Sequence, residues 1–285
     1  MKVAVLLNAR ASHATHGECA HEILAACREA GISARVHVCD AAQLTTMARS
    51  LAGTVDAVVA AGGDGTVNAV ATGLVNTGVP LGVIPLGTRN HFAKDIGIPD
   101  MASAIAVIAE GRTKAIDIGE VNGRVFVNNS SIGLYPEMVS DRNTLTWFPM
   151  LRATLRTLLR FPLLHVAVAL AGRVFSARTP FVMIGNNEYA LSVRDLGSRT
   201  RLDGGKLAVY TIRATKRLTM FATMLRALLR RKKPLELEAH TVDRADIVTT
   251  KRSVRVALDG EVYRMAPPLK YKSRPGALLV LGAKT

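Results

Sequence analysis

The chain has 285 residues, of which 49% are hydrophobic and 21% charged, so it is long enough for one large or two ordinary domains and too apolar to be disordered. Its net charge is +15, and the excess lies in the second part: residues 1–118 hold 9 Lys/Arg against 10 Asp/Glu, whereas residues 119–285 hold 28 against 12. No run approaches the roughly 18 apolar residues of a membrane span, and the three cysteines lack metal-ligand spacing, which favours a reduced, cytoplasmic protein.

The first 118 residues alternate between apolar runs and helix-compatible segments. We expect strands over residues 2–8, 34–38, 55–61 and 81–84, and helices over residues 18–30, 41–51, 67–74 and 101–110. This alternation predicts a parallel sheet with helices on both faces. Ligands of such sheets gather at the carboxyl ends of the strands, so the polar turn over residues 8–12 is a candidate binding loop.

The third apolar run ends in a glycine-rich turn, Gly62-Gly63-Asp64-Gly65-Thr66. Its glycines let a ligand approach backbone N–H groups, and the helix that follows, with Thr66 as its expected N-cap, directs further N–H groups at the turn. A carboxylate inside such a phosphate cradle needs a cation beside it, so Asp64 is predicted to bind the Mg²⁺ of a nucleotide. The turn matches neither common phosphate-loop motif, and a plain turn after a buried strand is the alternative.

A second polar loop, residues 85–92, follows the fourth expected strand. Thr88 and Asn90 lie just beyond the strand end, and either is a suitable N-cap for a following helix. Because the carboxyl ends of parallel strands meet at one edge of the sheet, we expect this loop to share a site with the glycine turn.

Near residue 113 the pattern changes to short strands separated by turns. The expected strands cover residues 114–121, 124–128, 177–184, 207–212, 247–250, 253–258, 269–271 and 277–281. We therefore predict an α/β protein with an N-terminal parallel-sheet nucleotide-binding lobe, residues 1–118. A C-terminal all-β sandwich lobe with helical insertions follows over residues 119–285, and its last strand is free to return to the first lobe.

Two expected helical insertions carry much of the positive charge. Residues 142–160 contain four arginines, residues 213–233 contain eight basic residues, and neither segment contains an acid. Apolar residues at helical spacing fill their other faces, which suits an anionic membrane surface; packing on the β lobe is equally compatible. Nucleic acid is not expected, since aromatic residues make up 5% of the chain and no reading motif is present. A homodimer is left open.

Residues 257–261 end a strand in a tight turn that carries two carboxylates, Asp259 and Glu261. The turn alone favours a simple hairpin corner. In phosphoryl transfer, however, a carboxylate held near a substrate hydroxyl accepts its proton, which makes both residues candidates for a catalytic base.

Five motifs, in this order along the chain, resemble the catalytic domain of the diacylglycerol kinase family, which is related to sphingosine and ceramide kinases: residues 62–68, 85–92, 117–119, 126–133 and 258–261. The resemblance implies Mg²⁺-dependent transfer of the γ-phosphoryl group of ATP to a lipid hydroxyl, such as that of diacylglycerol or a sphingoid base, in a cleft between the lobes. It implies Asp259 or Glu261 as catalytic carboxylate, Asp64 near Mg²⁺ and Asp117 as a further carboxylate beside the cleft. The nucleotide-contacting residues it implies are Asn8, Ala9, Arg10, Ala11, Ser12, Gly62, Gly63, Asp64, Gly65, Thr66, Val67, Asn68, Ala69, Thr88 and Asn90.

The chain departs from the family pattern at four positions. Ala9, Ala69 and His91 stand where relatives usually have Pro, Glu and Asp, which leaves metal count and nucleotide affinity open. Gly204 replaces an Asp with which many relatives help hold a structural Mg²⁺. Two alternatives therefore remain: a kinase for a soluble substrate, of the NAD kinase type, and a non-catalytic lipid- or nucleotide-binding relative. The expected location of a lipid kinase is the cytoplasmic surface of the inner membrane.

Overall fold

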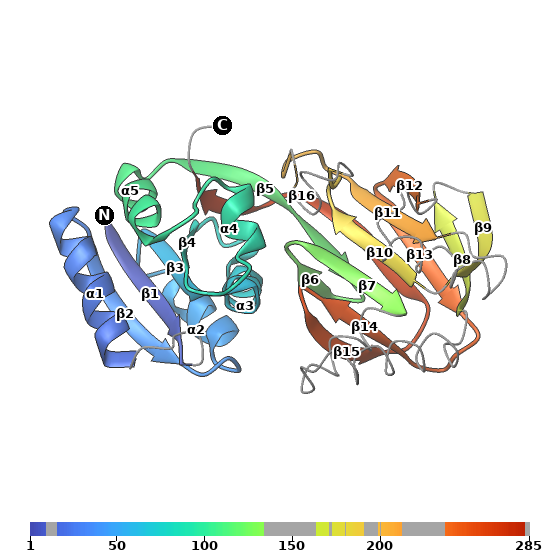
Figure 1. The fold of residues 1–285 in the computed structure, drawn as a ribbon, viewed down its shortest axis with the longest axis horizontal. Coiled ribbons are helices and arrows are strands. Elements are labelled where there is room, and N and C mark those ends of the chain that lie inside the picture. Colours follow the sequence, from blue (N-terminus) through green and yellow to red (C-terminus); the bar gives the residue numbers. More distant parts are fainter. Residues whose placement is uncertain are drawn as a thin grey trace, which may run out of the picture.

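A computed structural model describes residues 1–9, 16–133, 164–170, 173–179, 181–190, 199, 201–212 and 237–282. The two basic segments predicted as membrane-facing helices, residues 142–160 and 213–233, lie outside the described residues, as do Arg10, Ala11 and Ser12. None of the helices described here combines the length and apolar character needed to cross a membrane. Two lobes lie side by side, an α/β lobe and a β lobe, as predicted (Figure 1).

The α/β lobe is built on four parallel strands in the order β2-β1-β3-β4. The strands are β1 (Lys2–Asn8), β2 (Ser33–Cys39), β3 (Ala57–Gly62) and β4 (Leu81–Pro85). The helices are α1 (His16–Glu29), α2 (Leu44–Leu51), α3 (Asp64–Leu74), α4 (His91–Asp95) and α5 (Met101–Glu110). Every residue of β3 is buried, as is the centre of β1, which explains their continuous apolar runs.

The β lobe is a sandwich of two sheets that share one apolar core. One is a six-stranded sheet in the order β12-β11-β10-β7-β14-β15, and the other continues the sheet of the first lobe through β16, β13, β8 and β9. The early strands are β5 (Thr113–Val121), β6 (Arg124–Phe126), β7 (Asn129–Gly133), β8 (Leu164–Leu170), β9 (Arg173–Thr179) and β10 (Phe181–Asn186). The later strands are β11 (Leu207–Ile212), β12 (Leu237–Val242), β13 (Arg244–Thr249), β14 (Val254–Leu258), β15 (Glu261–Met265) and β16 (Leu269–Leu281).

Two long strands, β5 and β16, run between the lobes (Figure 1). They pair antiparallel with each other, and the far end of β16 pairs in parallel with β4 through Val280 and Leu81. The sequence predicts two separate strands where β16 runs unbroken, because Pro275-Gly276 interrupts the pattern; the structure accommodates them with a register shift between Arg274 and Leu278. The predicted boundary at residue 118 falls inside β5.

Candidate active site

The glycine turn after β3 enters a helix earlier than predicted. α3 begins at Asp64, with Gly63 at the N-cap position and no side-chain cap. The prediction that Thr66 is the N-cap is therefore wrong, since Thr66 lies inside the first turn of α3. Its hydroxyl accepts a hydrogen bond from Nδ2 of Asn8 at 2.9 Å. Thr66 thus links the ends of β1 and β3, two neighbouring strand ends that each precede a predicted binding loop.

The second loop, between β4 and α4, packs directly on the glycine turn. The N–H of Leu86 donates to the carbonyl of Gly62 at 3.1 Å. Asn90 occupies the N-cap position of α4 in the left-handed region, with φ 50°, but it caps no helical N–H. Its side chain closes on Gly87 instead, accepting from the Gly87 N–H at 3.0 Å and donating to the Gly87 carbonyl at 2.7 Å. The prediction of Asn90 as an N-cap residue is therefore confirmed for its position, whereas its side chain braces the loop instead of binding a helical N–H.

Gly87 is expected to be intolerant of a side chain. A Cβ at this position would lie 2.6 Å from Cα of Gly63 and 2.7 Å from Oδ1 of Asn90, so Gly87→Ala must push the two loops apart. We expect this variant to lose about 1–3 kcal/mol of unfolding free energy and to bind nucleotide more weakly. Urea denaturation and titration with a fluorescent ATP analogue test this. Gly53→Ala, where a Cβ meets nothing within 4 Å, is the matched control, and equal behaviour of the two variants would contradict the packing described.

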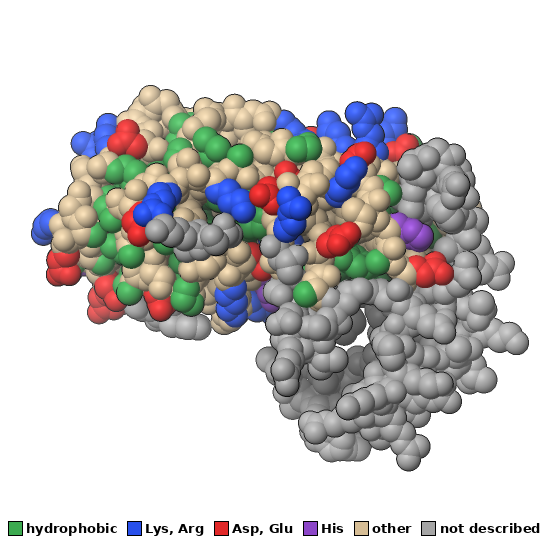
Figure 2. Space-filling model, turned by 90° about the horizontal axis from the view of Figure 1, so that it is seen from above, with side chains coloured by type: hydrophobic (Ala, Val, Ile, Leu, Met, Phe, Trp, Pro, Cys, Tyr) green, Lys and Arg blue, Asp and Glu red, His purple; other side chains and the backbone are tan. Residues whose placement is uncertain are grey.

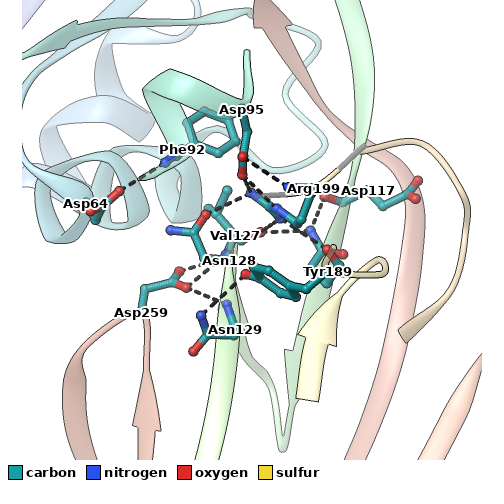
Figure 3. Close-up of polar contacts among 11 residues, drawn as sticks. Asp64, Phe92, Asp95, Asp117, Val127, Asn128, Asn129, Tyr189, Arg199 and Asp259 are labelled. Atoms are coloured by element: carbon teal, nitrogen blue, oxygen red, sulfur yellow. Dashed lines mark hydrogen bonds and ion pairs between the residues drawn. The ribbon is translucent and has the colours of Figure 1, made fainter. Parts of the chain in front are cut away.

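Asp64 connects the glycine turn to α4. Its Oδ1 accepts a hydrogen bond from the backbone N–H of Phe92, the second residue of α4, at 3.1 Å (Figure 3). Asp64 is also the first residue of α3, so its carboxylate lies at the start of two helices, where backbone N–H groups stabilise negative charge. The contact between Asp64 and the N–H of Phe92 is not predicted by the sequence.

The donor set around Asp64 fits a cation held mainly by phosphate. Among the described residues, no group of three or more His, Cys, Asp or Glu side chains converges on a metal site. Mg²⁺ in nucleotide sites is usually bound through one or two carboxylates, with phosphate oxygens and water in the other positions. A single carboxylate beside a phosphate cradle fits that pattern.

The acidic turn on the β lobe is a two-residue hairpin between β14 and β15. Asp259 and Gly260 both have positive φ, 47° and 93°, as the tight turn requires. The carboxylate of Asp259 folds back and accepts three backbone N–H groups, from Val127 at 2.7 Å, Asn128 at 2.8 Å and Asn129 at 2.9 Å. Asp259 therefore fixes the connection between β6 and β7, as Figure 3 shows.

Burial raises the pKa of the Asp259 carboxyl to about 6, against the lowering effect of the three N–H donors and Arg199. The folded protein then holds a proton that the unfolded chain, with a pKa of 3.8, releases. This contribution to the free energy of unfolding is fully present below the unfolded pKa and is lost as the pH rises through about 6.

The difference in unfolding free energy between wild type and Asp259→Asn is expected to fall with rising pH. We expect a decrease on the order of 2 kcal/mol from about pH 4 to about pH 7, because only the wild type loses the proton. Urea denaturation at several pH values measures this difference. A difference that stays constant over the range would show that the carboxyl titrates alike in both states.

Glu261 opens β15 and faces the other lobe. Its Oε2 accepts a hydrogen bond from the Tyr263 hydroxyl at 2.5 Å, and burial together with this carboxylate raises the pKa of Tyr263 to about 12. Its Oε1 lies 3.7 Å from the point that a Cβ on Gly65 would occupy. The structure thus brings the acidic turn and the first turn of α3 together, although they are distant in sequence and belong to different lobes.

Asp117 was expected beside the cleft, but it is a buried structural acceptor. Its side chain accepts hydrogen bonds from Nδ2 of Asn187 at 3.0 Å and from the N–H groups of Gly205 at 2.6 Å and Gly276 at 3.0 Å. The residue is 2% exposed. It therefore ties together three segments of the β lobe rather than facing a substrate.

The residues around Gly204 do not fit the structural Mg²⁺ that the family resemblance implies. A Cβ on Gly204 would lie 2.6 Å from Oδ1 of Asn187, so the amide of Asn187 takes the space that a second Asp would use. This Oδ1 accepts from the Gly204 N–H at 3.0 Å. Asp203 pairs with Lys114 at 3.4 Å and Arg201 at 3.3 Å. The carboxylates and the amide oxygen near this loop, those of Asp117, Asp203 and Asn187, are thus already engaged by backbone N–H groups or by cationic side chains, which leaves a Mg²⁺ without its ligands.

Chelation is therefore expected to leave the nucleotide-free protein as stable as before. The thermal midpoint should change by less than about 1 °C on addition of EDTA, because the loop around Gly204 is held by hydrogen bonds and no bound ion contributes to its stability. Gly204→Asp should lose about 1–3 kcal/mol through overpacking against Asn187, unlike Gly53→Asp at an open turn. A midpoint that falls with EDTA and returns with Mg²⁺ would contradict this account.

Three residues near the site were not predicted from the sequence: Asp95, Tyr263 and Arg199. Tyr263 could have been found, since it lies two residues after Glu261 in an alternating segment and so shares its face. Asp95 and Arg199 contact each other across 104 residues of sequence, which no local pattern encodes.

The structure thus joins a parallel-sheet lobe with a phosphate-type loop to a β-sandwich lobe that presents a carboxylate. Residues 2–121 match the family model described as the diacylglycerol kinase catalytic domain. Residues 140–282 match the model described as the YegS C-terminal NAD kinase beta sandwich-like domain. The chain belongs to the diacylglycerol kinase family.

Several relatives are similar in part of their length. A diacylglycerol kinase of Bacillus subtilis (strain 168) is 44% identical over 90 residues, 30% of each chain. A probable lipid kinase YegS-like protein of Klebsiella pneumoniae (strain 342) is 45% identical over 91 residues, 30% of this chain and 31% of the relative. These matches thus span less than a third of the curated relatives.

Solved structures show the same fold over the whole chain. A crystal structure of a diacylglycerol kinase from Bacillus anthracis str. Sterne has a TM-score of 0.70 at 22% identity, covering 99% of this chain and 97% of that one. A second crystal structure from the same organism reaches a TM-score of 0.77 with the same coverage. At this identity the likeness establishes the fold.

Proposed function

We propose that this protein is an ATP- and Mg²⁺-dependent lipid kinase that transfers the γ-phosphoryl group to the hydroxyl of a lipid such as diacylglycerol or a sphingoid base. The observation that supports it most is the position of Glu261. Its Oε1 faces the first turn of α3, where the backbone N–H groups of the phosphate cradle begin. A proton acceptor that lies next to a phosphate site suits phosphoryl transfer.

The cradle binds the nucleotide in this proposal. Backbone N–H groups of residues 63–66 and the start of α3 contact the phosphates, and Asp64 holds Mg²⁺ together with phosphate oxygens. The bound ion neutralises phosphate charge. Asp64 orients its carboxylate through the N–H of Phe92, so that it approaches the phosphates from a fixed direction.

The geometry favours Glu261 over Asp259 as the base, a choice that the sequence left open. Both oxygens of Asp259 accept backbone N–H groups, so its carboxylate is already bound and serves to position the turn. Glu261 is exposed, and among the described residues its side-chain hydrogen bond is the one that Oε2 accepts from Tyr263. Its Oε1 accepts the proton of the acceptor hydroxyl as the bond from the hydroxyl oxygen to the γ-phosphorus forms and the bond from that phosphorus to the bridging oxygen breaks, with ADP as the leaving group.

A lipid acceptor implies that the protein catalyses the reaction at a membrane surface. The named relatives include a diacylglycerol kinase and a probable lipid kinase, which supports this substrate class. On the face shown in Figure 2, basic and acidic side chains of the described residues are interspersed. The concentrated positive charge lies in residues 142–160 and 213–233, which hold 12 basic residues and no acid, and these segments are proposed to contact anionic lipid.

The test is a phosphorylation assay with radiolabelled ATP over a total lipid extract and over anionic vesicles that contain diacylglycerol. We expect Mg²⁺-dependent label in a lipid that partitions into the organic phase. Label in NAD, with turnover indifferent to vesicles, would instead establish a soluble-substrate kinase. Binding of ATP without label in any acceptor would establish a non-catalytic relative.

A further inference from the structure

Arg199 is a buried cation at the junction of the two lobes. Its side chain is 0% exposed, and that of its partner Asp95 is 4% exposed. Nε and Nη2 both lie 2.8 Å from Oδ2 of Asp95, and the backbone N–H of Arg199 donates to Oδ1 at 3.3 Å. Asp95 is the last residue of α4, the helix whose first turn is bound by Asp64. Arg199 is therefore joined to the nucleotide lobe through one short helix.

The other donors of Arg199 reach the β lobe. Nη1 donates to the carbonyl oxygens of Val127 at 2.7 Å and Asn186 at 3.1 Å, and Nη2 donates to Oδ1 of Asn128 at 2.8 Å. With the two contacts to Asp95, five contacts match the five N–H donors of a guanidinium group. A guanidinium group whose five N–H donors are all engaged is planar and rigid, and it therefore fixes the relative position of the groups that it binds.

The segment that Arg199 holds is the same segment that Asp259 holds. Asp259 accepts the N–H groups of residues 127–129, while Arg199 binds the Val127 carbonyl and the Asn128 side chain. Figure 3 shows the resulting series of contacts, from Asp64 through α4 and Arg199 to the turn at Asp259. The phosphate cradle and the acidic turn are thus the two ends of one polar network.

We propose that Arg199 is a positioning residue for phosphoryl transfer, which fixes the acidic turn of residues 259–261 opposite the glycine turn. The inference rests on the proposed kinase function. Arg199 acts through Asp95 and residues 127–129 and touches no reacting atom. A misplacement of about 1 Å between reacting groups costs about 10²-fold in rate, so a loosened junction slows catalysis even when both loops are intact.

A purely stabilising role makes a different prediction. Removing one partner of a buried ion pair leaves an uncompensated charge, but replacing both partners by apolar residues of similar volume is often neutral or stabilising. A double variant, Arg199→Met with Asp95→Leu, therefore separates the two roles. If Arg199 only stabilises the fold, the folded double variant is as active as wild type, even where its thermal midpoint falls because the oxygens of Val127, Asn128 and Asn186 lose this donor.

The experiment compares wild type, R199M/D95L, R199K and a control double variant, K206M/D243L, which removes an exposed ion pair of the β lobe. Thermal midpoint, KM for ATP and kcat are measured on anionic vesicles that contain diacylglycerol. We expect R199M/D95L to fold, to keep KM for ATP within about threefold and to lose about 10²-fold in kcat. R199K keeps the positive charge but lacks the planar guanidinium group, so its kcat should lie between those of wild type and R199M/D95L. The control K206M/D243L should have the kcat of wild type.

A readout independent of activity uses spin labels at Ser50→Cys on α2 and Lys251→Cys between β13 and β14, both exposed. The distance distribution between lobes should shift or broaden in R199M/D95L and R199K. Wild-type kcat in a folded R199M/D95L, or unchanged distance distributions in both variants, overturns the inference. An inactive wild type with altered distances in the variants overturns the proposed function instead.

Discussion

Replacing Glu261 with Gln is expected to lower kcat by about 10²–10⁴-fold while KM for ATP stays within about twofold. Gln keeps the size of the side chain and an oxygen that can accept from Tyr263, so the turn remains in place. What it loses is the basic oxygen that faces the first turn of α3. Steady-state kinetics with lipid vesicles measure both constants.

Glu110→Gln is the matched control, because this exposed residue ends α5 and pairs only loosely with Arg112 at 3.5 Å. It should be as active as wild type. Comparable loss of kcat in both variants would point to a general effect of charge, and full activity of Glu261→Gln would place the base elsewhere.

Asp64→Asn is expected to lower kcat/KM for MgATP on the order of 10²-fold. The amide oxygen still accepts the Phe92 N–H, so α4 keeps its anchor while the charge facing the phosphates disappears. The Mg²⁺ concentration for half-maximal rate should rise, and the thermal midpoint should stay close to that of wild type.

Asp56→Asn serves as control, since this residue accepts the backbone N–H of Lys2 at the opposite end of β3. An Mg²⁺ dependence of Asp64→Asn equal to that of wild type and of this control would remove Asp64 from the metal site.

The parallel-sheet lobe could be predicted because β1 and β3 are buried on both faces and therefore read as unbroken apolar runs. The start of α3 could not, because the glycines that open the helix carry low intrinsic helix propensity and suggest a loop. The sequence predicts two strands in place of β16, because Pro275 and Gly276 are unfavourable in a strand. In the structure, residues before and after this pair both hydrogen-bond to β5, so that β16 is one strand.

The sequence could predict the two loops and the acidic turn of the candidate site, because each of them concentrates glycine, polar or acidic residues in a few consecutive positions. The sequence could not distinguish Asp259 from Glu261 as the base. The three N–H groups that bind the Asp259 carboxylate lie about 130 residues away in sequence. Arg199 and Asp95 are 104 residues apart, and nothing near either residue indicates its partner. Such contacts are properties of the packed lobes.

A crystal structure with Mg²⁺ and a non-hydrolysable ATP analogue will show whether the glycine turn and the acidic turn form one nucleotide site. We expect phosphates bound to the N–H groups at the start of α3, Mg²⁺ on Asp64, and the γ-phosphate directed at Glu261 with room for one hydroxyl between them. A triphosphate bound away from α3, or one whose γ-phosphate points away from the β lobe, would contradict this expectation.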